Sequence, residues 1–187
     1  MKTNDRRVAA LFGLLTLVLV LVAMTNNLFL HWAFERHQNQ LSWYIRPLFL
    51  IPFCFFAYKR SWAGITATVF LLLTSTFWFP KPLVVDESVK QFLQFEQDWL
   101  MGHWDLGKIG MSLFVPVSMT ALGMAFWKKS IFMGLVVLFA IAVGKISWSI
   151  LMAGQAGGAT VVPALLGLLI CCILTYFGFK RLERRSR

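Results

Sequence analysis

Six long blocks of apolar residues dominate the sequence, and each approaches the roughly 20 residues that an α-helix needs to cross a bilayer. We therefore predict six membrane-spanning helices, at residues 8–24, 41–58, 62–79, 109–127, 131–153 and 160–179. Charged residues make up 14% of the chain, against about 25% in soluble domains. This excludes a water-soluble enzyme, a disulfide-stapled secreted module and a disordered chain. The expected fold class is an all-α membrane protein with one integral domain over residues 1–187.

The distribution of charge predicts how these helices are oriented. Twelve Lys and Arg residues, with only two acidic residues, flank the block ends on one side, whereas the other side has four basic and six acidic residues. Basic residues concentrate on the cytoplasmic side of membrane proteins, so both termini are expected in the cytoplasm. The net charge of +10 then reflects orientation, and we expect no nucleic-acid partner. The basic tail 180–187 could also hold anionic lipid.

The connections between blocks predict which helices pair. The turns 59–61 and 128–130 are so short that each must join two antiparallel helices. Small residues at Ala140, Gly144, Ala164 and Gly167 predict close helix contacts. Prolines should bend the spans that contain them, namely Pro47, Pro52, Pro116 and Pro163.

Two outer connections carry different expectations. After the breaker Pro80-Lys81-Pro82, Asp86 can cap a helix over 86–101. Its apolar residues share one face, which predicts an amphipathic interfacial helix on the outer leaflet or over the bundle. The last outer connection contains Gly154, Gly157 and Gly158, and we expect it to be flexible.

Two charged residues within the blocks are the first candidates for ligand binding. Lys145 lies about 12 Å from the outer end of its span and Arg46 about 7.5 Å, at 1.5 Å per residue. Ionisable groups at such depth usually face a partner or a wet cavity. Ser149 lies one turn from Lys145 and extends the polar face. For Arg46, the alternative is that its side chain reaches the lipid headgroups.

Glu96 and His103 are candidates for ligand binding and, more weakly, for acid–base catalysis. If the helix continues, they project in nearly the same direction from its apolar face. A buried carboxyl beside an imidazole could exchange a proton. The alternative is that Gly102 ends the helix, which leaves His103 in a loop.

The metal-binding signal is weak. His31 and Glu35 are one helical turn apart and could contribute to a transition-metal site, but no dense ligand motif is present. Cys54, Cys171 and Cys172 lie in apolar blocks and are expected to act as small hydrophobic residues. We expect no cofactor.

One stretch resembles a pattern found in small uncharacterised bacterial inner-membrane proteins. It consists of Phe77-Trp78-Phe79-Pro80-Lys81-Pro82, followed by Phe92-Leu93, Glu96 and Trp99-Leu100. The resemblance covers about 25 residues and brings no activity with it. It implies a bacterial inner-membrane location and draws attention to Glu96 and Trp99.

Three functions fit these features. The first is a protein that binds, transports or conducts a small or lipid-like ligand, with an anionic group favoured, through an outward-facing cavity. The second is an accessory or scaffold subunit, which would form a homo- or hetero-oligomer. The third, ranked last because no nucleophile is evident, is an enzyme acting at the outer leaflet.

Overall fold

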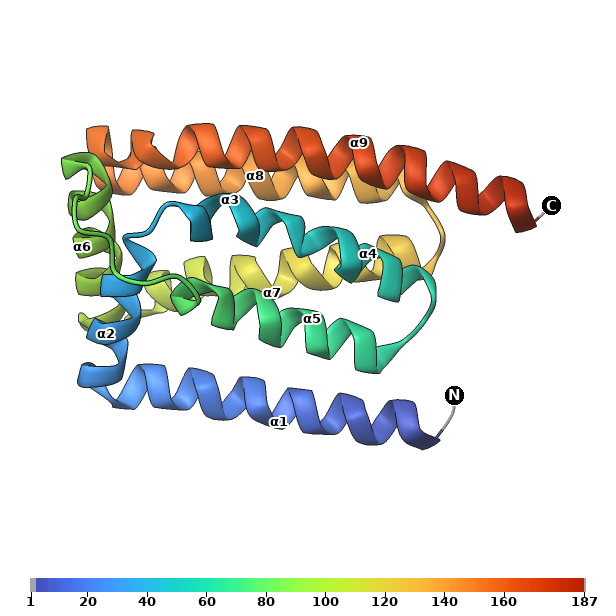
Figure 1. Cartoon of the computed structure of the whole chain (residues 1–187), viewed down its shortest axis with the longest axis horizontal. Helices are drawn as coiled ribbons and strands as arrows, with labels where there is room; N and C mark the ends of the chain where they lie inside the picture. The colour runs from blue at the N-terminus through green and yellow to red at the C-terminus, as the bar shows by residue number, and fades with distance from the viewer. Residues whose placement is uncertain (1–2, 187) are drawn as a thin grey trace.

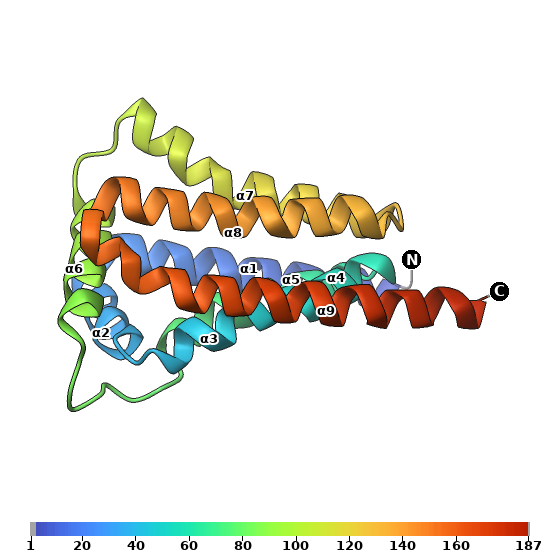
Figure 2. The same ribbon diagram turned by 90° about the horizontal axis from the view of Figure 1, so that it is seen from above.

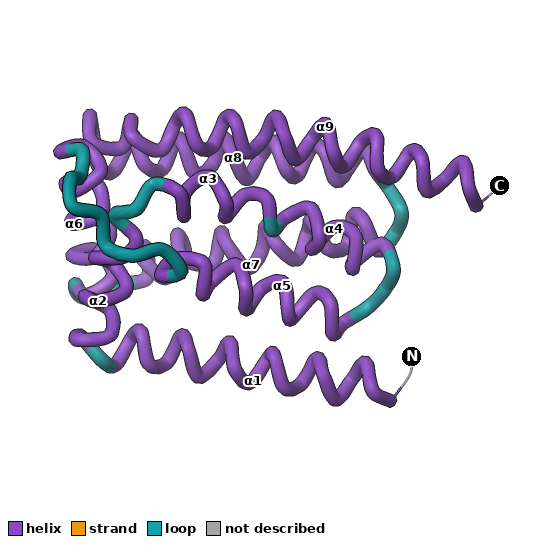
Figure 3. Tube along the Cα trace, viewed as in Figure 1, coloured by secondary structure: helices purple, strands orange, loops and turns teal. Residues whose placement is uncertain are grey.

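The computed structural model describes residues 3–186, which are helical apart from short connections and contain no strand (Figure 3). The elements in order are α1 (Thr3–Thr25), α2 (Asn27–His37), α3 (Leu41–Leu48), α4 (Leu50–Tyr58), α5 (Trp62–Thr74), η1 (Ser75–Phe77), α6 (Glu87–Met101), α7 (Leu106–Trp127), α8 (Ile131–Ala153), η2 (Gly154–Thr160) and α9 (Val161–Ser186).

Four stretches of the described chain are long and apolar enough to cross a membrane. They are Thr3–Thr25, Leu41–Tyr58, Leu106–Trp127 and Ile131–Leu182. The last contains α8 and most of α9, which fold back on each other through η2 (Figure 1). A shorter apolar stretch runs over Trp62–Phe77. These lengths and compositions indicate a membrane protein.

The long helices lie side by side, whereas α2 and α6 lie across one end of them (Figure 1). We call α2 and α6 the cap, and the opposite end, which holds both termini, the turn end. Helix α1 packs on α5, α4 packs on both α5 and α7, and α9 packs on α8 and α3. The cap therefore closes one end of a layered helical bundle.

Two apolar cores follow from this arrangement. The larger lies between α4, α7, α8 and α9 and includes the buried Phe53, Leu122, Phe126 and Leu138. The smaller joins the cap to the bundle, because Val89, Phe92 and Leu93 of α6 pack with Trp43 of α3. The apolar face predicted for the helix over 86–101 is thus buried at these positions, and Asp86 caps that helix by accepting a hydrogen bond from the Ser88 N–H.

The two predicted hairpins end in turns of the same construction, at residues 59–61 and 128–130. The middle residues Arg60 and Lys129 have φ values of 56° and 59°. In each turn the N–H groups of this middle residue and of the serine after it donate to carbonyls of the last helical turn, which is a Schellman motif. The serine that follows then caps the next helix with its side chain. Each turn therefore stops one helix and starts the next.

An acidic side chain joins α1 to the start of α5. The Asp5 carboxylate accepts hydrogen bonds from the Ser61 hydroxyl at 2.8 Å and from the backbone N–H groups of Trp62 and Ala63 at 3.2 and 3.3 Å. A carboxylate is well placed at a helix N-terminus, where N–H groups lack partners. Asp5 therefore sets the register of α1 against α5.

The small-residue contacts predicted from the sequence are confirmed at two positions. A Cβ added to Gly144 would lie 2.5 Å from the Phe114 ring, and one added to Gly167 would lie 2.5 Å from Pro47. These glycines let α8 approach α7, and α9 approach α3.

The prolines act differently from one span to the next. The second apolar block is interrupted at Phe49, between Pro47 and Pro52, so that α3 and α4 are separate helices. Pro116 lies inside α7. The prediction of a bend was wrong for Pro163, because it lies in the first turn of α9, where a missing N–H costs little.

The expectation of a flexible glycine loop at the end of α8 was also wrong. Residues Gly154–Thr160 form the 3₁₀ helix η2, which packs on α6 and α8. Gly157 is buried against the backbone of α8, since a Cβ there would lie 2.0 Å from Ser149 O. Gly157 is therefore needed because only a residue without a Cβ can pack this closely against α8.

Candidate functional site

Polar side chains from four helices meet where the cap joins the bundle. We call this group, which consists of His37, Ser42, Arg46, Glu96 and Lys145, the cap cluster. His37 ends α2 and is buried, with Nδ1 at 2.8 Å from Ser42 Oγ and Nε2 at 3.1 Å from Arg46 Nη1. The structure therefore brings Arg46 into contact with a histidine that the sequence did not rank as a site residue.

The hydrogen bonds around His37 determine which of its ring nitrogens carries a proton. The Ser42 hydroxyl has one proton to donate, and it donates to Asn39 O at 2.8 Å. The Ser42 oxygen must then accept from His37 Nδ1–H, which leaves His37 Nε2 to accept from Arg46. His37 O in turn accepts from the Trp43 indole N–H at 2.9 Å. The ring is therefore held as one neutral tautomer.

Electrostatics also keep His37 neutral. Burial, and then the positive charges of Arg46 and Lys145, hold the pKa of His37 well below its ordinary value of 6.5. The protein environment thus favours an uncharged imidazole beside the Arg46 guanidinium.

Lowering the pH is expected to destabilise the protein through His37. Above about pH 6.5 this histidine is neutral in both states and its contribution is fully present. Below that pH the unfolded chain takes up a proton that the folded state resists, so stability falls by up to about 1.4 kcal/mol per pH unit until the lowered pKa is reached. Thermal unfolding of the purified protein between about pH 7.5 and 5 measures this loss.

The exposed His31 provides the control for this pH dependence. His31→Gln should retain the wild-type loss of stability, whereas His37→Gln should show a flatter profile from a lower starting stability. A level wild-type profile over the same range would contradict a neutral buried His37.

Among the described residues, Arg46 has no carboxylate partner in direct contact. Three ion pairs occur among the side chains that the structure describes (residues 3–182 and 184), and Arg46 belongs to none of them. Its Nη1 is used by His37. Its other N–H groups donate to no protein atom within the described residues, and none of these nitrogens is among the fully buried polar atoms that lack a partner. Arg46 therefore has free donors.

Glu96 and Lys145 form the second half of the cap cluster. Lys145 Nζ lies 2.6 Å from Glu96 Oε1 and 5.0 Å from the centres of both the Phe92 and Trp148 rings. The carboxylate also acts electrostatically on Arg46. With His37 neutral, Arg46, Lys145 and Glu96 give the cap cluster a net charge of +1.

Ser149 is fully buried, one turn from Lys145 on α8, and its hydroxyl has no hydrogen-bond partner in the described structure. Its carbonyl oxygen would lie 2.0 Å from a Cβ added to Gly157. The position of Ser149 thus places the end of α8 against η2.

The structure does not unite the other predicted pairs into a site. Helix α6 ends at Met101 with Gly102 as its C-cap, so His103 lies in the following connection and is exposed. His31 and Glu35 are 3.8 Å apart, but Glu35 is also 2.5 Å from Lys81, which holds the pKa of this carboxyl below its usual value. Among the side chains of residues 3–182 and 184, no group of three or more could hold a metal ion.

The sequence did not single out Lys108, which was counted only as one of the four basic residues on the outer side. Lys108 is buried, and its Nζ donates to Gly102 O at 2.9 Å. The same ammonium lies 4.6 Å from the Trp104 ring and 5.0 Å from the Trp99 ring. The sequence feature that could have indicated this contact is the pair Trp99 and Trp104 on either side of Gly102, since cations favour aromatic faces.

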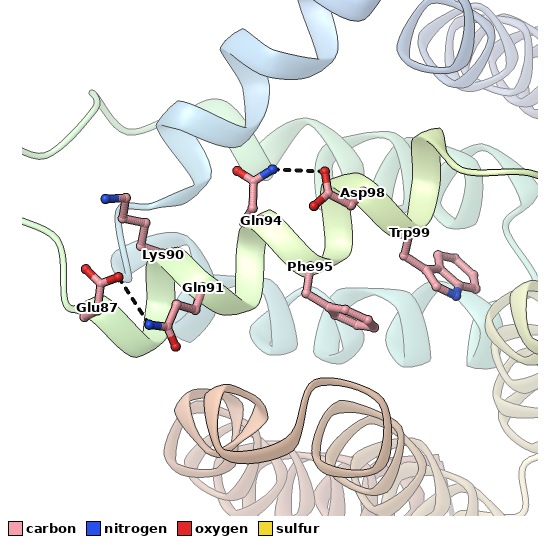
Figure 4. A pocket seen from close by; sticks show the side chains of 7 residues that line it. All are labelled: Glu87, Lys90, Gln91, Gln94, Phe95, Asp98 and Trp99. Atoms are coloured by element: carbon pink, nitrogen blue, oxygen red, sulfur yellow. Dashed lines mark hydrogen bonds between the residues drawn. The ribbon is translucent and has the colours of Figure 1, made fainter.

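An open groove of about 570 Å³ runs along α6, lined by Glu87, Lys90, Gln91, Gln94, Phe95, Asp98 and Trp99. In Figure 4, Phe95 and Trp99 leave the helix on one side, whereas Gln94 and Asp98 leave on the other and bond to each other at 2.9 Å. Neither Arg46 nor Lys145 lines this groove.

Comparison of the chain with models of protein families, with characterised proteins and with solved structures finds no match. The function is therefore inferred from the geometry of the cap cluster.

Proposed function

We propose that the protein is a bacterial inner-membrane protein with six spans, formed by α1, α3 with α4, α5 with η1, α7, α8 and α9. The cap then lies at the outer interface, with both termini and the two basic turns in the cytoplasm. The apolar stretches support this arrangement, as does the concentration of Lys and Arg at the turn end. The basic end of α9 would hold anionic lipid on the cytoplasmic side.

We infer that the cap cluster binds an anionic ligand, small or lipid-like, as part of a transport or binding function. The observation that carries this inference is Arg46, a permanent cation inside an apolar block that touches a neutral histidine and has no ion-pair partner in the described residues. An uncompensated cation in apolar surroundings is costly. An anion bound to its free N–H groups would supply the missing charge.

The ion pair of Glu96 favours binding over catalysis. Its carboxylate contacts Lys145, and His103 lies beyond the end of the helix. A general acid–base pair of Glu96 and His103 is therefore not supported by the geometry.

Replacing Arg46 by glutamine is expected to remove anion binding. We expect inorganic phosphate or phosphatidylglycerol, added to the purified protein in uncharged detergent, to raise the Tm of the wild type. Arg46→Gln should weaken the effective probe by about tenfold or more, which corresponds to about 1.4 kcal/mol. Dose–response curves of Tm against probe concentration measure the change.

Lys90→Gln is the matched control, because Lys90 is an exposed cation on α6 that lies outside the cap cluster. It should respond to the probes as the wild type does. A full response of Arg46→Gln to both probes would remove Arg46 from the site and overturn the proposal.

A further inference from the structure

Helices α7 and α8 separate as they approach the cap (Figure 2). They are in close contact where Phe114 packs on Gly144. Between this contact and the cap, α7 exposes apolar side chains such as Leu113, at 53%, and α8 exposes Leu151, at 81%. We call these two diverging, exposed segments the fork.

The open position of α7 is set by its own contacts. Its first turn is tied to the connection after α6, because the Nζ of the buried Lys108 donates to Gly102 O and lies close to both the Trp99 and Trp104 rings. Pro116, near the base of the fork, removes an N–H from the helix and favours a bend. The end of α7 is therefore held away from α8 rather than left frayed.

The base of the fork lies beside Lys145 of the cap cluster. Lys145 follows Gly144 directly, and its side chain is 46% exposed. Trp148 lies one turn from Gly144 on the same face of α8, and its ring contacts the Lys145 ammonium. Trp148 also packs on Phe95 and Trp99 of α6. Aromatic rings thus connect the fork to the cap cluster.

We propose that the fork admits, from the plane of the bilayer, a lipid whose headgroup is a singly charged phosphodiester. This rests on the anion-binding function proposed above and names its ligand class. The phosphate binds Arg46 and Lys145 while the acyl chains lie along the exposed side chains of α7. The net charge of +1 in the cap cluster matches one negative charge, and Arg donors suit phosphate oxygens.

The apolar walls of the fork favour a lipid over a free anion. A hydrated small anion would lose its water against exposed apolar side chains such as Leu113 and Leu151, whereas a lipid carries apolar chains that match these surfaces. The lipid phosphate would compete with Glu96 for Lys145, since both bind the same ammonium.

A substitution at Gly110 tests the route of entry. Gly110 lies one turn from Phe114 on the face of α7 that meets α8, and a Cβ added there has no neighbour within 4 Å. Gly110→Leu therefore adds an apolar side chain at an open position on this face of α7. The matched control is Gly13→Leu in α1, where an added Cβ also has no neighbour within 4 Å.

The readout is the rise in Tm of each purified variant in uncharged detergent with phosphatidylglycerol, with zwitterionic phosphatidylcholine, or with dimethyl phosphate, a phosphodiester without acyl chains. We expect phosphatidylglycerol to stabilise the wild type and Gly13→Leu equally. Gly110→Leu and Lys145→Gln should each require about tenfold more of this lipid. Phosphatidylcholine and dimethyl phosphate should have little effect.

Two results would overturn the lipid inference and leave the proposed function intact: a wild-type response of Gly110→Leu to phosphatidylglycerol, or an Arg46-dependent response to dimethyl phosphate as large as that to the lipid. A response to any probe that is independent of Arg46, or no response at all, would overturn both proposals.

Discussion

Gly157→Ala is expected to destabilise the protein by about 3 kcal/mol or more. Its Cβ would lie 2.0 Å from Ser149 O and 2.8 Å from Ile150 N. These atoms belong to the backbone of α8, so relief requires movement of η2 or of the end of α8. The movement would also disturb the Thr160 hydroxyl, which donates to Gly157 O at 2.8 Å. Thermal unfolding in detergent measures the loss.

The neighbouring glycine supplies the control. Gly158 is the next residue in η2, but an added Cβ there has no neighbour within 4 Å. Gly158→Ala should unfold close to the wild-type temperature. Equal stability of the two alanine variants would show that η2 does not pack on α8 as described.

Reversing the charge of Lys145 is expected to have the second-largest effect. Lys145→Glu would replace a 2.6 Å ion pair with two carboxylates and would remove the cation from the Phe92 and Trp148 rings. Since Lys145 is about half exposed, the expected loss is about 2 kcal/mol, below that for breaking a fully buried pair. Equilibrium unfolding of the single variant against the wild type gives this value.

The swapped pair distinguishes an ion pair from general disruption. Lys145→Glu combined with Glu96→Lys should recover most of the lost stability, because the pair is restored with its order reversed. The exposed pair of Glu35 and Lys81 is the comparison, and Lys81→Glu should cost less because solvent screens that interaction. A double variant as unstable as the sum of its single variants would contradict a direct pair.

Local patterns predicted much of the helix layout. The helix over 86–101 forms at Glu87–Met101 with Asp86 as its cap, since capping and amphipathic spacing involve residues within a few positions of one another. The hairpin turns at 59–61 and 128–130 were predictable for the same reason. The glycines of η2 were misjudged because their role depends on the α8 backbone, which packs on them only in the folded chain.

The site was predictable only as separate residues. Lys145, Arg46 and Glu96 stood out because charge in an apolar context is costly, but nothing local showed that Lys145 pairs with Glu96, 49 residues away. The contact of His37 with Arg46 depends on the bend between α2 and α3. The cage around Lys108 depends on where α6 ends and α7 begins.

The amino-acid sequence by itself determined that the chain is helical and that its helices suit a membrane. It also determined where most of the helices begin and end, because helix length, capping and periodicity are short-range properties. Only the tertiary structure decided which charges meet, which histidine is buried and where α7 parts from α8. Those outcomes depend on distances between side chains on helices far apart in sequence, where Coulomb and packing energies change steeply within a few ångströms.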